Sequence, residues 1–465
     1  MPQGVRRTQI DRETMPLVYA IVGLLAVVWT AVFALRGSLV AGCLAYLTVA
    51  ICFGHPFWRQ EIGPVPVTLD RLVLVVLIAS YFIQWRLGRT DPKQLGWADW
   101  LLLAFVGMLG FATVRLPWQG GFPGGTETVM RLLIGYLTPV CLYWIARQAS
   151  LTQRSVVLVQ AVLAVMGLYL AVTGILEVSG QWRAVFPKHI ADPEAGIHFG
   201  RARGPMVHAV SYGLVLAVCL LAGWLWRARF GRVGQLVIIV AMPVLLAGIY
   251  LSYTRSVWMG AALGTMIVLG LTLHGQWRPL VLGSMIAAGL LLAVTRMDKL
   301  LSFEREYGAQ YTRKSVDLRG SFAYISWQMF LDRPFLGFGF NQFPEAKLPY
   351  LADRSTDLDL EAIRPYSHHC TFLSILTETG LIGLILFLAV LAAWGVSAWQ
   401  LALDPHAAPW AQSHAVLMLA AMGVYSIQAI FHELSYTPID NSLLFLLAGV
   451  TVGLAQSRRS LPRTC

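Results

Sequence analysis

Apolar runs long enough to cross a bilayer recur along almost the whole chain, separated by short polar segments. They lie at residues 16–35, 39–54, 72–85, 98–114, 129–146, 155–177, 209–226, 235–252, 257–274, 279–295, 371–402, 412–431 and 442–457. A helix needs about 20 apolar residues to cross the hydrocarbon core, so this pattern predicts an all-α polytopic membrane protein with about 12 transmembrane helices. Runs 39–54 and 72–85 are short for a full crossing, and a count of about 13 also fits.

Arginine in the short connections predicts the orientation of these spans. The basic residues that alternation places on one side are Arg86, Arg89, Lys93, Arg147, Arg154, Arg227, Arg229, Arg232, Arg278, Arg458, Arg459 and Arg463. By the positive-inside rule that side is cytoplasmic, although the basic N-terminal arm fits it only if one early run is re-entrant. The opposite face then receives the long polar segment 296–370, with an amphipathic helix expected around Phe322–Leu331. We therefore expect one membrane domain, residues 1–465, with 296–370 as a long external loop containing short helices.

Composition agrees with a membrane protein: 57% of residues are hydrophobic, 13% are charged and the mean hydropathy is +0.63. The net charge of +11 comes mostly from arginine. In a chain of this kind such charge indicates orientation and contact with anionic membrane lipid, and no basic run stands apart to indicate nucleic-acid binding. The six cysteines show no metal-ligand or redox spacing, so no disulfide framework is expected.

Two arginine motifs fall on the predicted external face. Arg201 and Arg203 precede the span that begins near residue 209, where the positive end of a helix favours a bound anion. Arg255 lies in a turn so tight that it must be at or just inside the membrane surface, where an isolated arginine is costly without a partner. The structural alternatives are an interfacial anchor for the first pair and snorkelling to the interface for Arg255.

Two further motifs complete the set on that face. Arg319 precedes a turn with one proline and two glycines at 334–339, and a loop arginine of this kind is commonly only solvated. His368 and His369 stand at the junction with the span from residue 371, where a histidine can take a proton from a hydroxyl group. Adjacent histidines cannot face the same way, so at most one is expected to act as the base. Glu378, farther along the same span, is interpreted as an orienting or packing carboxylate, and no spacing of ligands indicates a metal site.

In their order these motifs resemble the O-antigen ligase and polymerase superfamily. The matching stretches are Arg201-x-x-Gly204, residues 252–255, Arg319 followed by Pro334-x-x-Gly337-x-Gly339, and His369 followed after ten residues by Gly380. The same count from His368 reaches Thr379, so the resemblance favours His369. Cys370 departs from the amide or hydroxyl residue usual after that histidine.

The resemblance implies a bacterial inner-membrane glycosyltransferase with its active site facing the periplasm. Its donor would be an undecaprenyl-diphosphate-linked glycan, its acceptor a lipid A-core glycolipid or another glycan, and no metal or other cofactor would be required. His369 would be the base, with Arg255, Arg203, Arg201 and Arg319 on the diphosphate and His368 and Glu378 in support. The chemistry agrees, because arginine can stabilise a leaving diphosphate and a base must take the acceptor proton as the anomeric centre inverts.

Other classes of membrane protein fit less well. A transporter of lipid-linked glycans would carry ionisable residues at mid-span, where this chain has few apart from Glu378 and the pair His432 and Glu433. A scaffold would not need Arg255 or a histidine at the mouth of a span. Within the resemblance, ligation to lipid A-core is the expected reaction, and polymerisation of repeat units or transfer to protein stay open because all three share the donor chemistry.

Overall fold

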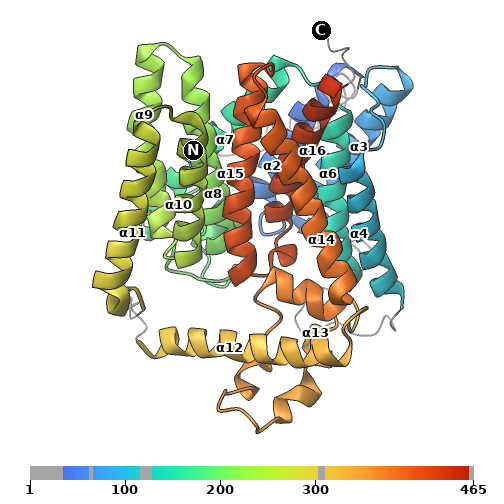
Figure 1. Cartoon of the computed structure of the whole chain (residues 1–465), viewed down its shortest axis with the longest axis vertical. Helices are drawn as coiled ribbons and strands as arrows, with labels where there is room; N and C mark the ends of the chain where they lie inside the picture. The colour runs from blue at the N-terminus through green and yellow to red at the C-terminus, as the bar shows by residue number, and fades with distance from the viewer. Residues whose placement is uncertain (1–34, 62–65, 116–127, 302–308, 460–465) are drawn as a thin grey trace, which may run out of the picture.

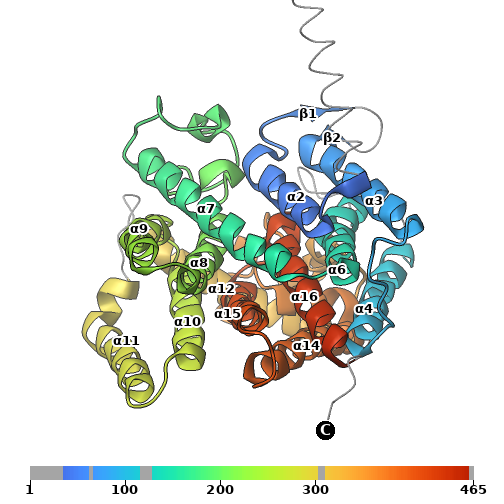
Figure 2. The same cartoon turned by 90° about the horizontal axis from the view of Figure 1, so that it is seen from above.

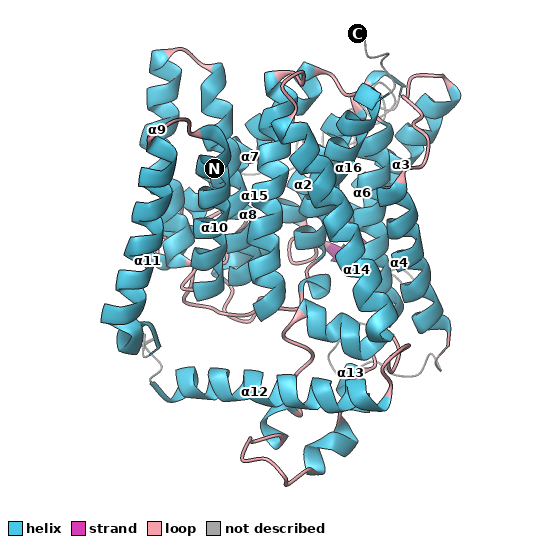
Figure 3. Ribbon diagram, in the orientation of Figure 1, coloured by secondary structure: helices cyan, strands magenta, loops and turns pink. Residues whose placement is uncertain are grey.

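The computed structural model describes residues 35–61, 66–115, 128–301 and 309–459, and their regular secondary structure is almost entirely helical (Figures 1 and 3). The longer helices are α2 (Leu39–Phe53), α3 (Leu69–Arg86), α4 (Trp97–Val114), α6 (Thr138–Gln148), α7 (Gln153–Val178), α8 (Ala209–Trp226), α9 (Arg232–Leu251), α10 (Arg255–Thr272), α11 (Trp277–Leu301), α12 (Ala309–Asp332), α14 (Thr371–Leu403), α15 (Pro409–Phe431) and α16 (Pro438–Arg459). Short helices are α5 (Thr128–Leu132) and α13 (Phe343–Ala346), and the only strands in the described residues are β1 (Arg59–Gln60) and β2 (Val67–Thr68), which pair antiparallel.

Nine helices in the described part of the chain are long and apolar enough to cross a membrane. They are α4, the continuous α5–α6 rod, α7, α8, α9, α10, α14, α15 and α16. Two shorter apolar helices, α2 and the first part of α11, add to these, and α3 has the length of a span but carries three charged residues. The chain is therefore an all-α multi-pass membrane protein, while the run expected at 16–35 lies outside the described residues and the count of 12 stays a prediction.

Burial separates central spans from peripheral ones. In α8 and α16, 89% of the apolar window is buried inside the protein, against 17% in α9. Seen along the bundle, α8, α15 and α16 lie in the middle, with α9–α11 to one side and α2–α6 to the other (Figure 2). Small residues allow the close contacts: a Cβ added to Gly264 of α10 would lie 2.6 Å from Leu221 of α8 and 2.9 Å from Val424 of α15.

The polar segment before α14 forms a cap across one end of the bundle, which we define as residues 309–370. Figure 1 shows α12 lying crosswise beneath the spans, with α13 beside it. The cap has a small core of its own, in which Phe322, Ile325 and Met329 of α12 pack with residues from the following loops. The amphipathic helix expected around Phe322–Leu331 is thus confirmed as part of the longer α12. The preceding span ends later than the sequence predicts, because α11 continues to Leu301.

Candidate functional site

The glycine motif after α12 is fitted into a break in α14. Gly380 has φ 69° and ψ −168°, which interrupts α14 after residue 379. The free backbone groups at the break pair with the loop: the N–H of Leu381 donates to the carbonyl of Pro334 (2.7 Å) and the N–H of Gly339 donates to the carbonyl of Glu378 (2.8 Å). Gly337, at φ 60°, approaches so closely that a Cβ there would lie 2.5–2.6 Å from backbone atoms of residues 377–379. The two sequence motifs are therefore halves of one interlock.

A buried arginine, Arg131 of α5, holds this interlock to the rest of the bundle. Its guanidinium donates to both carboxylate oxygens of Glu378 (2.7 and 2.9 Å), and it forms a second ion pair with Glu433 at 3.4 Å. It also donates to Asn341 in the loop after the glycines (3.2 Å) and to the hydroxyl of Ser435 (2.8 Å). One side chain thus joins α5, the cap, α14 and the connection between α15 and α16, and the orienting role expected of Glu378 stays a prediction.

The two adjacent histidines have different surroundings. His368 is 2% exposed, its Nε2 is 2.9 Å from the hydroxyl of Ser326, and its ring packs against Phe343 at 4.2 Å between centroids. His369 is half-buried, and its ring lies against Phe322 at 4.8 Å. His368 is thus built into the core of the cap, and His369 is the better placed of the two to meet a substrate.

The two arginines ahead of α8 also differ. Arg203 is fully buried: its Nε donates to Glu177 of α7 (3.0 Å), and its terminal nitrogens donate to the carbonyls of Ala195 (2.7 Å) and Ile190 (2.9 Å). These bonds fold the loop between α7 and α8 around its guanidinium. Arg201 is half-buried on the same loop. Either arginine was expected to bind the diphosphate. The geometry favours Arg201, because the donors of Arg203 are occupied inside the protein.

The predicted tight turn lies between α9 and α10. Tyr253 adopts φ 45° and reverses the chain, so that Arg255 becomes the first residue of α10. The loop that carries Arg201 is attached at the same place, because the N–H of Ala202 donates to the carbonyl of Leu251 at the end of α9 (2.9 Å). Two of the predicted arginine motifs therefore meet at this corner.

His432, directly after α15, lies where all these segments come together. Its Nε2 is 3.1 Å from the hydroxyl of Ser256, and its carbonyl accepts from the N–H (3.2 Å) and the hydroxyl (2.9 Å) of Thr371, the first residue of α14. Burial, with smaller contributions from the nearby His208 and Arg319, holds the pKa of His432 well below its ordinary value. His208, the N-cap of α8, lies near enough to affect the pKa of His432, so the N-terminal ends of α8, α10 and α14 all lie near this residue.

The electrostatics of the site favour anions and a neutral base. Helix N-termini carry partial positive charge, and three of them converge here. Arg319 reaches from α12 over the end of α15, with its guanidinium carbon 5.3 Å from the ring centre of Phe431. Burial, the charge of Arg319 and then that of Lys347 lower the pKa of His369 below its ordinary value of 6.5. At neutral pH His369 is thus unprotonated, which is the form a general base requires.

Sequence reasoning missed the central parts of this arrangement, Arg131 and His432. Each left a signal, because an ionisable residue within or at the end of an apolar run needs a partner and is a functional candidate by default. The sequence does not show which partner each residue meets, since Arg131 and its partner Ser435 are separated by 304 residues. Among the described residues, His, Cys, Asp and Glu form no group of three that could hold a metal ion.

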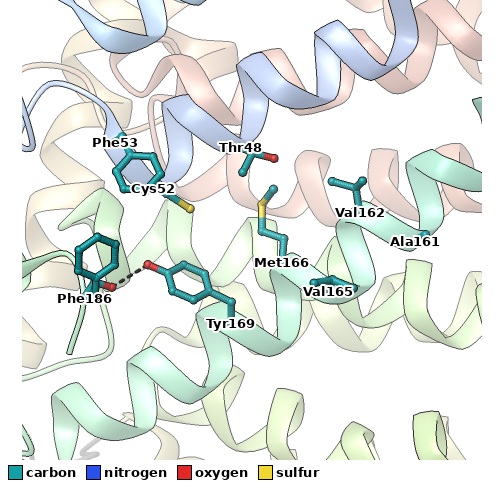
Figure 4. Close-up of a pocket in the computed structure, with 9 residues that line it drawn as sticks. All are labelled: Thr48, Cys52, Phe53, Ala161, Val162, Val165, Met166, Tyr169 and Phe186. Atoms are coloured by element: carbon teal, nitrogen blue, oxygen red, sulfur yellow. Dashed lines mark hydrogen bonds between the residues drawn. The ribbon is translucent and has the colours of Figure 1, made fainter. Parts of the chain in front are cut away.

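The structure also has an apolar cavity of about 430 Å³ between α2 and α7. Figure 4 shows its lining, in which the hydroxyl of Tyr169 is satisfied by the carbonyl of Phe186 (2.7 Å). The remaining lining residues are Thr48, Cys52, Phe53, Ala161, Val162, Val165 and Met166. This lining suits a hydrocarbon chain and offers no group for the chemistry.

One family model matches part of the chain. Residues 240–388 match the model of the O-antigen ligase family, a segment that begins in α9 and contains Arg255, Arg319, His369 and Gly380. Over this segment, about a third of the chain, the protein is similar to the O-antigen ligase family. No curated protein matches the chain in a direct search.

The matched segment and the candidate site overlap. The matched segment contains the turn before α10, the whole cap and the broken first part of α14, which together supply most of the candidate groups. Arg201 and His432 lie outside it, on the flanking loops that pack against the same corner. The similarity therefore supports a transferase of polysaccharide biosynthesis in a membrane.

Proposed function

We propose that this O-antigen ligase-like chain is an inverting, metal-independent glycosyltransferase. It moves a glycan from an undecaprenyl-diphosphate carrier to a hydroxyl of a lipid A-core glycolipid, at the periplasmic face of the bacterial inner membrane. The observation that carries the proposal is that the first turn of α10, which begins at Arg255, meets the N-terminal end of α14 and Arg319 near His369 and His432. Such a site binds an anion of high charge beside a neutral base.

In the reaction, the acceptor oxygen attacks the anomeric carbon from the face opposite the diphosphate. The bond between that carbon and the diphosphate oxygen breaks, and its electron pair leaves with the diphosphate. His369 takes the proton of the acceptor hydroxyl. Arg255 and Arg201 stabilise the departing charge through forked N–H donors in place of a metal ion, with Arg319 at the open side. Arg203 keeps the loop of Arg201 folded through Glu177, and Glu378 keeps the broken α14 in place through Arg131.

Purified protein, an undecaprenyl-diphosphate glycan and lipid A-core provide the test. We expect the wild type to form product with or without a chelator, and His369→Ala and Arg255→Ala to lose most activity. Arg232→Ala is a matched control, because Arg232 is the first residue of α9 as Arg255 is of α10, and it lies at the opposite end of the bundle. Equal product from all four proteins would refute the mechanism.

Two other outcomes would replace the proposal. Movement of the substrate between leaflets without transfer would make the chain a transporter. Extension of carrier-linked repeats, with no transfer to lipid A-core, would make it a repeat-unit polymerase. In cells lacking the chain, completed glycans on the carrier lipid would indicate a ligase and single repeats a polymerase.

A further inference from the structure

The pair formed by Ser256 and His432 has a part in the site that no motif in the sequence assigns to it. The hydroxyl of Ser256 is 3.1 Å from Nε2 of His432, and Ser256 is only 5% exposed. Ser256 directly follows Arg255 in the first turn of α10, so the pair stands beside the main candidate for diphosphate binding.

A hydrogen bond between serine and a neutral histidine always leaves one donor at an end of the pair. If the hydroxyl of Ser256 donates to Nε2, the proton of the ring is on Nδ1 and can be donated onward. If Nε2 carries the proton and donates to Ser256, the hydroxyl hydrogen is the one left over. In both arrangements the pair presents one N–H or O–H donor, and an anionic oxygen is the acceptor that such a donor favours most.

The surroundings of His432 keep the ring neutral. The groups near it are His198, His208, His369 and Arg319, and with burial they hold its pKa well below the ordinary value. A neutral ring retains both a donor and an acceptor, as the pair requires, whereas a protonated ring could not accept from Ser256.

We infer that Ser256 and His432 act together as a neutral hydrogen-bond donor to the diphosphate of the glycan carrier, next to Arg255. This inference rests on the proposed function, because it needs a diphosphate in the site. It assigns His432 to binding of the donor substrate and leaves the proton of the acceptor to His369.

The structure permits side-chain substitutions that leave the framework of the site in place. His432 is joined to Thr371 through its backbone carbonyl, which every substitution retains. Ser256→Ala removes only a hydroxyl group, and His432→Phe keeps a planar ring without a donor. His432→Gln restores an amide donor. His414→Phe is a control for losing a buried histidine, since His414 lies within α15, the helix that His432 follows, and is 3.2 Å from the carbonyl of Leu447 between spans.

Steady-state transfer by the full chain in detergent gives the test, with the concentration of undecaprenyl-diphosphate glycan and of acceptor varied separately. We expect Ser256→Ala and His432→Phe each to lower kcat/KM for the donor roughly 10- to 100-fold, as for loss of a hydrogen bond to a charged group. The kcat/KM of the double variant should be no lower than that of the less active single variant, because either change removes the same donor. KM for the acceptor and the acid limb of the pH profile should stay unchanged, and His432→Gln should recover part of the activity.

Several results would overturn the inference while leaving the proposed function intact. These are losses of kcat/KM that add in the double variant, wild-type kinetics in both single variants, or a change in KM for the acceptor alone. An acid limb that disappears in His432→Phe but persists in His369→Ala would make His432 the base. A fall in activity matched by His414→Phe would indicate a structural role only. Absence of transfer by the wild type would refute the proposed function itself.

Discussion

The substitution Gly380→Ala tests the interlock between the glycine loop and the break in α14. Gly380 combines φ 69° with ψ −168°, a region open to glycine and costly for other residues by about 1–3 kcal/mol. An added Cβ would also overlap the carbonyl of Phe335 and lie 2.6 Å from the N–H nitrogen of Leu336. Because these are backbone atoms, the loop has to move as a whole.

Moving the loop costs the bonds between it and the broken helix. The N–H groups of Phe338 and Gly339 donate to the carbonyls of Thr377 (2.9 Å) and Glu378 (2.8 Å), and the N–H of Leu381 returns a bond to the loop. Losing one or two of these bonds at about 1 kcal/mol each, in addition to the strain, gives a destabilisation of about 2–5 kcal/mol. Proteins are stable by only about 5–15 kcal/mol, so the effect is large.

Thermal unfolding in detergent and the transfer assay measure this prediction. Gly380→Ala should lower Tm and also reduce transfer, because residues 371–379 form the short helix that follows His369. Gly110→Ala in α4 is the control, since an added Cβ there meets no atom within 4 Å in a helical segment. If Gly380→Ala and Gly110→Ala had the same Tm and the same transfer activity, the interlock would not be what positions His369.

Three further changes test the buried charges and the base. Arg131→Met leaves buried carboxylates unpaired and should lower the free energy of unfolding by about 3–5 kcal/mol. Adding Glu378→Gln should recover part of the loss in Tm. No recovery would mean that Arg131 and Glu378 are not a coupled pair. Arg319→Gln removes a positive charge that lowers the pKa of His369, so that pKa should rise and the acid limb of the pH–rate profile should move to higher pH; a shift to lower pH would contradict the assignment. Arg203→Met should lower Tm as Arg131→Met does, because it leaves the buried carboxylate of Glu177 unpaired. A variant that is as stable as wild type but binds the donor weakly would indicate that Arg203 binds the diphosphate.

The order of the motifs and their common face could be predicted from the sequence, but their joint geometry could not. The resemblance led to Arg255, Arg319 and His369, each of which lies near the cluster around His432. It did not separate His369 from His368 by environment or Arg201 from Arg203. Those choices depend on which donors are already used inside the protein, as those of Arg203 are by Glu177.

The sequence by itself determined that this chain is a bundle of membrane helices, because the free energy of placing a helix in a bilayer is nearly a local sum over its own residues. For most spans in the described residues it also determined where helices begin and end to within a few residues, whereas α11 and α12 extend beyond their predicted limits. Only the tertiary structure decided how the polar groups pair: the loop of Gly337 in the break at Gly380, Arg131 with two carboxylates, and Ser256 with His432. Such pairing depends on packing between segments far apart in the chain, and a polar residue in an apolar run shows that it needs a partner without showing which one.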